Sequence, residues 1–440
     1  MGPRGGARYS FAGFALALAL GLALALSACA AREERVTLRV MSGQDPEAQA
    51  IDAVEFRSFE AAHPGVTIVD MPVPTGADYR ETVFARIATS APPDLFLLDG
   101  ADVAAVAARG VVLDLQPFVA GAGVSLSRFF PQVIAPFRMR ETLLAFPRGF
   151  SPTVYYYNRD LWDRAGLAAP RNGWTQSEFL TAVRALTRDT NGDGVVDQWG
   201  TTLDHRLGAW QAWMWSAGAD VLTPDGLRAT GAVDQPAAES TLTFLTQLSA
   251  RGFVPPRAAG NAAGEAPDVA QRMFTAGRLG LLGGGHGLLP VLRRTTAPGG
   301  AGMRVGVVSV PRAPSHEVRT PLDATGWAVR GNTPHRPLAV ALAAWMVRTS
   351  AQRRRAVAGL DVPALFSVAY EAAARDASGL EMEFLWQVPY GAMPWGARVA
   401  RYREVETAMR TLMDRVVDER IPVKAAVRDA AKAADSVLAR

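Results

Sequence analysis

Cysteine and lysine are nearly absent from this chain. Cys29 is the only cysteine in 440 residues, so no disulfide within the chain can hold the fold, and burial of apolar side chains must do so. Lys424 and Lys432 are the only lysines, and arginine supplies the remaining positive charge. The formal net charge is only +4, and the one basic run, residues 353–355, contains no aromatic residue. These features argue against a nucleic-acid partner.

Long apolar stretches are confined to the N-terminal leader, so no second membrane segment is expected. The leader begins with two arginines, continues with an Ala/Leu run over residues 11–25 and ends in Leu-Ser-Ala-Cys. This order predicts a secretory signal peptide over residues 1–28. The ending is similar to the lipobox of bacterial lipoproteins, which implies cleavage before Cys29 and a lipid on its thiol. The alternative interpretation is a lone buried cysteine.

Strand-like and helix-like patterns alternate after the leader. Residues 36–41 alternate between apolar and polar side chains, as a strand does, and residues 51–62 carry apolar side chains at helical spacing. Residues 66–69 and 94–98 are further apolar runs of strand length, and a helix-like segment lies between them. The alternation predicts βαβ units and an α/β fold with largely parallel sheets. The chain is long enough for two domains of roughly 100–200 residues each.

Two helix starts carry clear capping signals. Asn158 stands before a short predicted helix over residues 159–165, where its side chain can accept a hydrogen bond from a free backbone N–H group. Thr175 and Glu178 have the spacing of a capping box, and Trp174 and Phe179 fall at the flanking staple positions. These signals predict local structure and carry no information about function.

Several short motifs follow one another along the chain. The most specific runs from Leu144 to Trp162 and includes Tyr-Tyr-Tyr-Asn-Arg-Asp-Leu-Trp. It is accompanied by Pro-Asp-Leu-Phe at 93–96, Phe-Thr-Ala-Gly-Arg at 274–278, Gly-Trp-Ala-Val at 326–329 and Pro-Ala at 363–364. Together these motifs, which cover nearly the whole mature chain, resemble the extracellular solute-binding proteins of family 1. Those proteins are the substrate-capturing components of ABC sugar importers.

The resemblance implies a two-lobed periplasmic-binding-protein fold of the type II kind, with the ligand cleft between the lobes. We expect crossings between the lobes near residues 146–151, 322–326 and 361–366, where proline and glycine favour connectors. The expected division is 29–146 plus 324–362 for the N-terminal lobe and 147–323 plus 363–440 for the C-terminal lobe. The resemblance also implies a carbohydrate ligand, an ABC permease as partner, a monomeric chain and an extracytoplasmic location with a lipid anchor in the cell membrane.

A sugar site needs polar groups for each buried hydroxyl and aromatic side chains for the apolar ring faces. Gln44 and Asp99 follow strands at their carboxyl ends, where open α/β sheets bind ligands, and Arg148 lies in the first expected hinge. His286 stands in a glycine run at a place where members of the family carry a cleft aromatic. The aromatic candidates, for which core packing is the alternative, are Tyr155, Trp210, Trp213, Trp327 and Trp395.

Residues 189–197 have the oxygen spacing of a calcium-binding loop. Asp189, Asn191, Asp193 and Asp197 occupy positions one, three, five and nine of such a loop. The twelfth position is a glycine instead of the bidentate glutamate. The two interpretations are a structural calcium site and a solvated acidic turn, and no other cofactor is expected.

Recognisable catalytic motifs are missing from the sequence. The histidines show no metalloprotease spacing, and no Gly-x-Ser-x-Gly elbow occurs. Carboxylate pairs for glycoside hydrolysis are set in space, so the sequence leaves them open. We expect a non-enzymatic binding protein that captures a mono- or oligosaccharide, or a derivative such as a glycerophosphodiester, by closure of its lobes. The alternatives are a surface-anchored carbohydrate-active enzyme and a sensory or adaptor lipoprotein.

Overall fold

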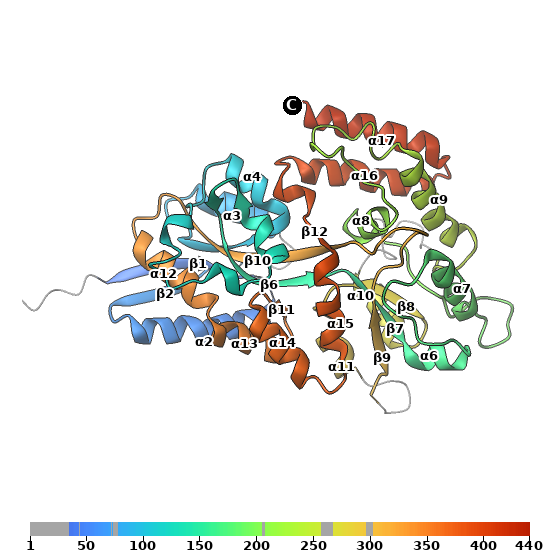
Figure 1. Ribbon diagram of the computed structural model, residues 1–440, viewed down its shortest axis with the longest axis horizontal. Coiled ribbons are helices and arrows are strands. Elements are labelled where there is room, and N and C mark those ends of the chain that lie inside the picture. Colours follow the sequence, from blue (N-terminus) through green and yellow to red (C-terminus); the bar gives the residue numbers. More distant parts are fainter. Residues whose placement is uncertain are drawn as a thin grey trace, which may run out of the picture.

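Two sheets at different ends of the molecule organise the chain (Figure 1). The computed structural model describes residues 35–43, 45–71, 73, 78–204, 207–256, 267–295 and 302–440. Within these residues, the larger sheet has the order β11-β6-β10-β3-β1-β2, with β12 beside β10, and the smaller sheet has the order β8-β7-β9. A separate hairpin pairs β4 (Arg138–Met139) with β5 (Thr142–Leu143). Cys29 and the predicted signal peptide lie outside the described residues.

The larger sheet is mixed in direction. β1 pairs in parallel with both β2 and β3, as the alternating strand and helix patterns predicted. β10 runs antiparallel to β3 and to β6, and β11 runs antiparallel to β6. The strands are β1 (Val36–Met41), β2 (Val66–Asp70), β3 (Leu95–Asp99), β6 (Phe146–Pro152), β10 (Thr320–Val329), β11 (Val362–Pro363) and β12 (Gly391–Ala392).

The smaller sheet departs from the expectation of largely parallel strands. β7 (Val154–Asn158) lies in its centre, and both β8 (Leu281–Gly284) and β9 (Val305–Val308) run antiparallel to it. The reason is direction: β7 continues β6 away from the larger sheet, whereas β8 and β9 run back toward it. The sequence pattern of an apolar strand does not distinguish these two directions.

The helices cover these sheets in the positions that Figure 1 shows. They are α2 (Pro46–Ala62), α3 (Tyr79–Ile87), α4 (Val103–Ala108), α5 (Pro131–Ile134), α6 (Arg159–Arg164), α7 (Gln176–Leu186), α8 (Leu207–Trp215), α9 (Pro236–Ala250), α10 (Pro267–Thr275), α11 (Leu288–Arg294), α12 (Arg336–Met346), α13 (Thr349–Ala358), α14 (Phe366–Arg375), α15 (Leu380–Trp386), α16 (Tyr402–Val417) and α17 (Val423–Leu438).

The capping signals of the sequence are confirmed. The Asn158 side chain accepts a hydrogen bond from the backbone N–H of Leu161 at 3.1 Å and begins α6. Thr175 and Glu178 form the reciprocal capping box that begins α7. Each cap satisfies backbone N–H groups that have no partner within the helix, which fixes where the helix starts.

Apolar side chains form two buried clusters that share the smaller sheet. Tyr156 belongs to the cluster that surrounds the larger sheet, whereas Tyr155 and Tyr157 belong to the cluster formed with α7, α8, α9, α16 and α17. This split follows from the strand, because successive side chains point to opposite faces. The segment 363–440 contributes to both clusters, through α14 and α15 on one side and α16 and α17 on the other. The lobe boundaries expected from the sequence therefore stay a prediction.

Two paired strands connect the sheets where hinges were expected. β6 ends at Pro152 one residue before β7 begins, and Leu322 of β10 pairs with Pro152. The register of this ladder shifts between Thr325 and Gly326. Paired strands can bend where their register is irregular. The junction of the two sheets therefore lies at residues 149–153 and 320–326.

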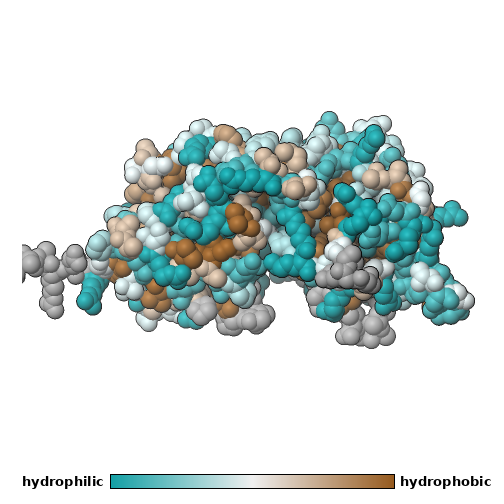
Figure 2. Space-filling model, turned by 90° about the horizontal axis from the view of Figure 1, so that it is seen from below, coloured by the Kyte–Doolittle hydropathy of each residue, from teal (hydrophilic) through white to brown (hydrophobic). Residues whose placement is uncertain are grey.

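The face of the molecule seen from below in Figure 2 is largely polar. Figure 2 shows that hydrophilic residues predominate on the face seen from below, with apolar atoms gathered in smaller areas. Among the described residues, no helix combines the length and the apolar character that crossing a membrane requires.

Candidate ligand-binding cleft

A cavity open to solvent lies at the junction of the two sheets. It lies between the smaller sheet, helix α8, strand β10 and helix α16, and its free space, including the solvent at its open mouth, is about 1400 Å³. β7 supplies Tyr155, β10 supplies Asp323, and α16 supplies Arg403 and Glu406. The wall therefore combines aromatic, acidic and basic side chains from segments that are far apart in the sequence.

Carboxylates dominate the charge of this cavity. The Asp323 side chain is exposed to the cavity, yet protein surrounds it closely, so water hydrates it less fully than at an open surface. This partial burial and the charges of Asp99 and Glu406 raise the pKa of Asp323 to about 7, against the opposing charge of Arg403. Burial is also the main cause that raises the pKa values of Asp99 and Glu406 above their ordinary values.

Among the described residues of the cavity wall, Arg403 is the one arginine, and carboxylates already hold it. Arg403 donates from Nε to Oδ1 and from Nη2 to Oδ2 of Asp102, both at 3.0 Å. A third contact joins Nη1 of Arg403 to Oε2 of Glu406 at 3.4 Å. Asp102 is almost fully buried and also lies 3.5 Å from Arg80, measured between Oδ1 and Nη1. The guanidinium of Arg403 is thus fixed in place and largely neutralised.

A second cavity of about 950 Å³ is lined by the end of α8 and the turn after it, by Arg319 just before β10, and by residues between 392 and 398. Its wall includes Trp395, whose Nε1 donates to Oδ1 of Asp220 at 2.7 Å. The guanidinium of Arg398 lies over the Trp395 ring, 4.2 Å from its centre. Burial raises the pKa of Asp220, while the hydrogen bonds from Trp395 and Trp215 act in the opposite direction. This arrangement holds Trp395 rigidly at the edge of the junction.

The aromatic candidates are placed in different surroundings. Tyr155, Trp210 and Trp213 line the first cavity, and Trp395 lines the second. Trp210 and Trp213 are only 1% and 2% exposed, so they form the packed floor of the cavity and offer little open ring surface. Trp327 is 0% exposed within the cluster of the larger sheet and lines neither cavity. Its position is that of a core residue, because its side chain is packed among the buried residues of that cluster.

Asp99 and Gln44 were the two candidates expected at strand ends. Asp99 ends β3 and accepts a hydrogen bond from the backbone N–H of Ala101 at 2.8 Å, which caps the turn that follows. Its charge acts on Asp323, although its side chain does not line the cavity. Gln44 lies outside the described residues, so its predicted role stays a prediction.

Arg148 lies in a buried network of charges and not in either cavity. Its Nη1 is 3.8 Å from Asp52 and its Nε is 3.7 Å from Asp361. Arg355 completes the network with hydrogen bonds to both carboxylates. Burial, followed by the charge of Arg355, lowers the pKa of Arg148. β6 directs this side chain toward charged residues of α2 and α13, and its expected role as a ligand clamp stays a prediction.

His286 is likewise turned away from the cavity. It is 1% exposed, its backbone N–H donates to Ser151 Oγ at 2.7 Å, and its Nε2 lies 2.8 Å from Oε2 of Glu381. Its ring meets Phe384 edge-on, with 4.7 Å between the ring centres. The glycines before it line the cavity, but the chain turns after Gly285 and buries the histidine against α15.

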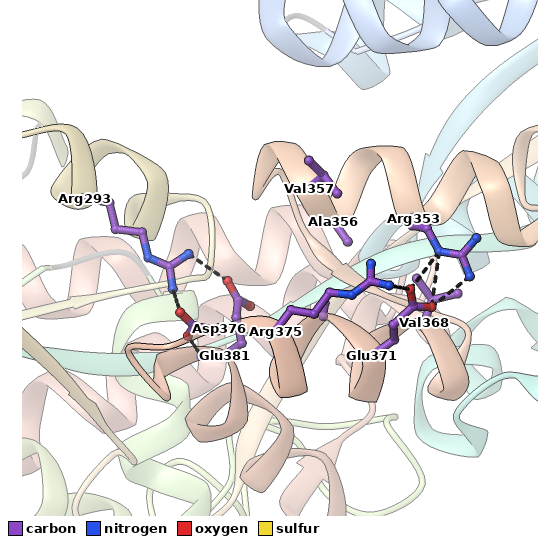
Figure 3. Close-up of a pocket in the computed structure, with 10 residues that line it drawn as sticks. Arg293, Arg353, Ala356, Val357, Val368, Glu371, Arg375, Asp376 and Glu381 are labelled. Atoms are coloured by element: carbon purple, nitrogen blue, oxygen red, sulfur yellow. Dashed lines mark hydrogen bonds and ion pairs between the residues drawn. The ribbon is translucent and has the colours of Figure 1, made fainter.

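The side of the molecule near α11, α13 and α14 carries a smaller pocket of about 510 Å³. Figure 3 shows three arginines at its rim, each joined to carboxylates by dashed lines. Arg293 pairs with Asp376 and Glu381, and both Arg353 and Arg375 pair with Glu371. Every charge at the rim is balanced by a neighbour, so this pocket offers no free charge to a ligand.

The acidic loop at residues 189–197 closes on itself. Asp189 accepts hydrogen bonds from the backbone N–H groups of Gly192 and Gly194, both at 2.7 Å. Asn191 and Asp193 each accept a backbone N–H two residues ahead, and Asp197 accepts from Thr190. Among the described residues, no group of three or more His, Cys, Asp or Glu side chains is arranged to hold a metal ion. Calcium binding by this loop stays a prediction.

Sequence patterns gave no sign of the charged residues of the two cavities. Asp323 precedes the Gly-Trp-Ala-Val motif by only a few residues, and this proximity is the one signal that could have singled it out. Arg403 and Glu406 belong to the polar face of an amphipathic helix, a place where charged side chains are usually solvated. Only the packing of α16 against the junction gives them a role.

Comparison with known proteins agrees with this architecture. The model of the bacterial extracellular solute-binding protein family matches residues 42–353. A Brucella abortus protein described as a binding protein is 24% identical over 266 residues, and a Brucella suis protein matches to the same extent. The matched segment is 59% of this chain and 59% of each relative, so the chain spans less than two thirds of their length in the match.

Solved structures show the same fold at low identity. An ABC substrate-binding protein of Listeria monocytogenes in complex with cycloalternan has a TM-score of 0.78 at 19% identity, covering 92% of this chain and 98% of that chain. The GacH receptor of Streptomyces glaucescens, crystallised with acarbose, has a TM-score of 0.77 at 20% identity and the same coverage, 92% and 98%. UgpB of Mycobacterium tuberculosis in complex with glycerophosphocholine has a TM-score of 0.77 at 18% identity, covering 92% and 99%.

These likenesses confirm the two-lobed α/β fold that the sequence motifs implied. The family model spans well over half of the chain, including the first expected crossing, the smaller sheet and the parts of the cavity wall that α8 and β10 supply. The chain belongs to the bacterial extracellular solute-binding proteins.

Proposed function

We propose that the protein captures a carbohydrate at the junction of its two sheets and delivers it to the permease of an ABC importer. The observation that carries this proposal is the cavity itself, where Asp323, Arg403 and Glu406 stand beside Tyr155. Carboxylates and a guanidinium satisfy hydroxyl groups, and aromatic side chains cover apolar ring faces. Family membership and the sugar complexes of the Listeria and Streptomyces proteins support the same class of ligand.

Ligand capture would act through an equilibrium between open and closed arrangements of the lobes. A ligand shifts such an equilibrium only if it binds one state more tightly, and a ligand touched by both lobes favours closure. The paired strands β6 and β10 connect the sheets and are the segments that would bend. Asp323 lies on β10 itself, so ligand contact and the bending strand share one element.

Binding is tested most directly by thermal shift and titration calorimetry. A panel of mono- and oligosaccharides, polyols and a glycerophosphodiester is added to the purified mature protein, and a rise in melting temperature identifies the ligand class. Substitution Asp323→Ala should abolish the shift, whereas Asp225→Ala, in an exposed turn away from the cavity, should preserve it. If every sugar fails while another class of solute binds, the proposal of a carbohydrate ligand is wrong.

We further propose that the cleft binds without catalysis. Asp323 and Glu406 are two carboxylates in one cavity, and the raised pKa of Asp323 is the property expected of a general acid, so glycoside hydrolysis is the specific alternative. Incubation with oligosaccharides separates the two functions. Product in excess of the protein would establish an enzyme, whereas full recovery of the intact ligand supports a binding protein.

We also propose that the mature protein is a monomer anchored by a lipid on Cys29 at the extracytoplasmic side of the membrane. The leader and its Leu-Ser-Ala-Cys ending support the anchor. Mass spectrometry of the N-terminal peptide should find a diacylglyceryl group on Cys29, and Cys29→Ser should move the protein from the membrane to the soluble fraction. A membrane-bound Cys29→Ser variant would contradict the proposal. Light scattering of the delipidated chain measures its oligomeric state.

A further inference from the structure

The first cavity carries an excess of negative charge. Among the described residues, four carboxylates, Asp99, Asp102, Asp323 and Glu406, act on one another at its wall, and the cations beside them are Arg403 and Arg80. A fifth carboxylate, Asp204, also lines the cavity. Both arginines lie against Asp102, and Arg403 donates its two shortest hydrogen bonds to the Asp102 carboxylate. With the first four carboxylates and both arginines ionised, four negative charges face two positive ones. The excess negative charge lies at Asp323 and Glu406.

Asp323 is the member of this group without a partner. Within the part of the chain that the structure describes, its carboxylate forms neither a hydrogen bond nor an ion pair, although it lines the cavity and reaches solvent there. Glu406 has one long contact to Arg403, at 3.4 Å. The pocket near α11 and α14 provides the contrast, because each of its carboxylates is matched by an arginine (Figure 3). An unmatched carboxylate in a ligand cavity is best explained by a partner that the ligand brings.

We infer that the ligand of this cleft carries a cationic nitrogen, as in an amino sugar or an aminocyclitol, and that the carboxylate of Asp323 binds it. This inference rests on the proposed function and names the class of carbohydrate. Asp323 is the specificity-determining residue, Glu406 adds to the negative potential, and Arg403 stays with Asp102 as a positioning residue.

Closure of the cavity decides between a cationic and a neutral ligand. When a ligand displaces water around Asp323, an ionised carboxylate without a counter-charge becomes costly. An ammonium group removes this cost by pairing with the carboxylate. A neutral sugar leaves two outcomes: the negative charge stays unpaired, or Asp323 takes up a proton from solution. The elevated pKa of Asp323 shows that the cavity already favours its neutral form, which is the same electrostatic tendency.

The aromatic wall supports the same ligand. Tyr155 lines the cavity with Asp323, and its ring is held by the buried ring of Trp213, which it meets edge to face with 6.0 Å between ring centres. The face of an aromatic ring attracts a cation, and it also packs against the apolar face of a sugar ring. The attraction to the cation is stronger when water is excluded. A cavity of carboxylates with an aromatic floor thus accommodates a ligand that has both a cationic nitrogen and a saturated ring.

The test uses matched pairs of ligands that differ only at one nitrogen. Isothermal titration compares glucosamine with glucose and with N-acetylglucosamine, and the deacetylated with the N-acetylated chitin disaccharide, on the mature protein at low salt. We expect the amine of each pair to bind at least about tenfold more tightly, since an added buried charge pair exceeds 1.4 kcal/mol. The preference should shrink as the salt concentration rises. Proton uptake, measured in buffers of different ionisation enthalpy, should accompany the neutral sugar and not the amine.

Variants link this preference to one side chain. Asp323→Asn should remove the preference for the amine, and Glu406→Gln should reduce it, which keeps the test valid if one variant folds poorly. Glu404→Gln is the matched control, because Glu404 is exposed on the same helix as Glu406. Equal or tighter binding of the neutral member overturns the inference and leaves the proposed function intact. Failure of every sugar, charged or neutral, to bind the folded protein overturns both.

Discussion

Asp102 and Arg403 form a two-bonded ion pair although 301 residues separate them in the sequence. Asp102 follows β3 in the larger sheet, and Arg403 lies in the first turn of α16, which packs in the cluster of the smaller sheet. Both bonds measure 3.0 Å, and Asp102 is almost fully buried. The pair therefore fastens helix α16 to the turn that follows β3.

Loss of this ion pair should destabilise the fold. We expect Arg403→Gln to lower the free energy of unfolding by about 2 kcal/mol, because it leaves the buried Asp102 carboxylate with only a distant contact to Arg80. Urea unfolding followed by circular dichroism measures the change. Arg401→Gln is the control: Arg401 forms an exposed pair with Glu404 at 3.6 Å, and its loss should cost less than about 0.5 kcal/mol. Equal effects of the two variants would contradict a structural role of the Asp102 pair.

Gly396 should tolerate no side chain. A Cβ atom at this position would overlap the backbone carbonyl of Ala101, which cannot move without displacing the turn that carries Asp102. We expect Gly396→Ala to cost about 2–3 kcal/mol, the usual penalty of overpacking, in chemical unfolding. Gly287 is a suitable comparison, since its φ is −59° and nothing lies within 4 Å of an added Cβ atom. Gly287→Ala should leave stability nearly unchanged, and a large loss there would argue that glycine as such is required.

The Glu381 carboxyl should contribute pH-dependent stability. Burial alone would raise its pKa, but the hydrogen bond and charge of His286 and the charge of Arg293 hold its pKa below the ordinary value of 4.5, with Asp376 opposing them. A carboxyl whose pKa is lower in the folded state stabilises the fold above its unfolded pKa. That stability is lost as the pH falls below 4.5 and through the folded pKa. Glu381→Gln should therefore lower the unfolding free energy by about 2 kcal/mol at pH 7 and by much less near pH 3. A difference that stays constant from pH 7 to pH 3 would refute this origin.

Chelation should leave the loop at residues 189–197 intact. Asp189, Asn191 and Asp193 already use side-chain oxygens to accept backbone N–H groups, so the loop is held without an ion. We expect the melting temperature to be the same in EDTA and in millimolar calcium. A rise of several degrees with calcium, lost in Asp193→Ala, would instead establish a structural calcium site.

Helix caps, strand positions and the order of the motifs along the chain could be predicted from the sequence. The caps at Asn158 and Thr175 depend on neighbours within three residues, so the sequence contains all of their geometry. The strands β1, β2 and β3 have apolar patterns of strand length, which predicted where they lie in the chain. The order of the motifs, together with the leader, is enough to indicate the family and the two-lobed fold.

The charged residues of the cleft could not be predicted in this way. Arg148 and His286 looked available on the chain, yet packing buries one beneath α2 and α13 and the other against α15. Asp323 and Arg403 looked like ordinary polar positions, yet the fold brings both to one cavity. The sequence determined where helices and strands begin and what family they build, because those choices rest on local spacing. Only the tertiary structure decided which charges are paired and which is left for a ligand, because pairing depends on distances between segments hundreds of residues apart.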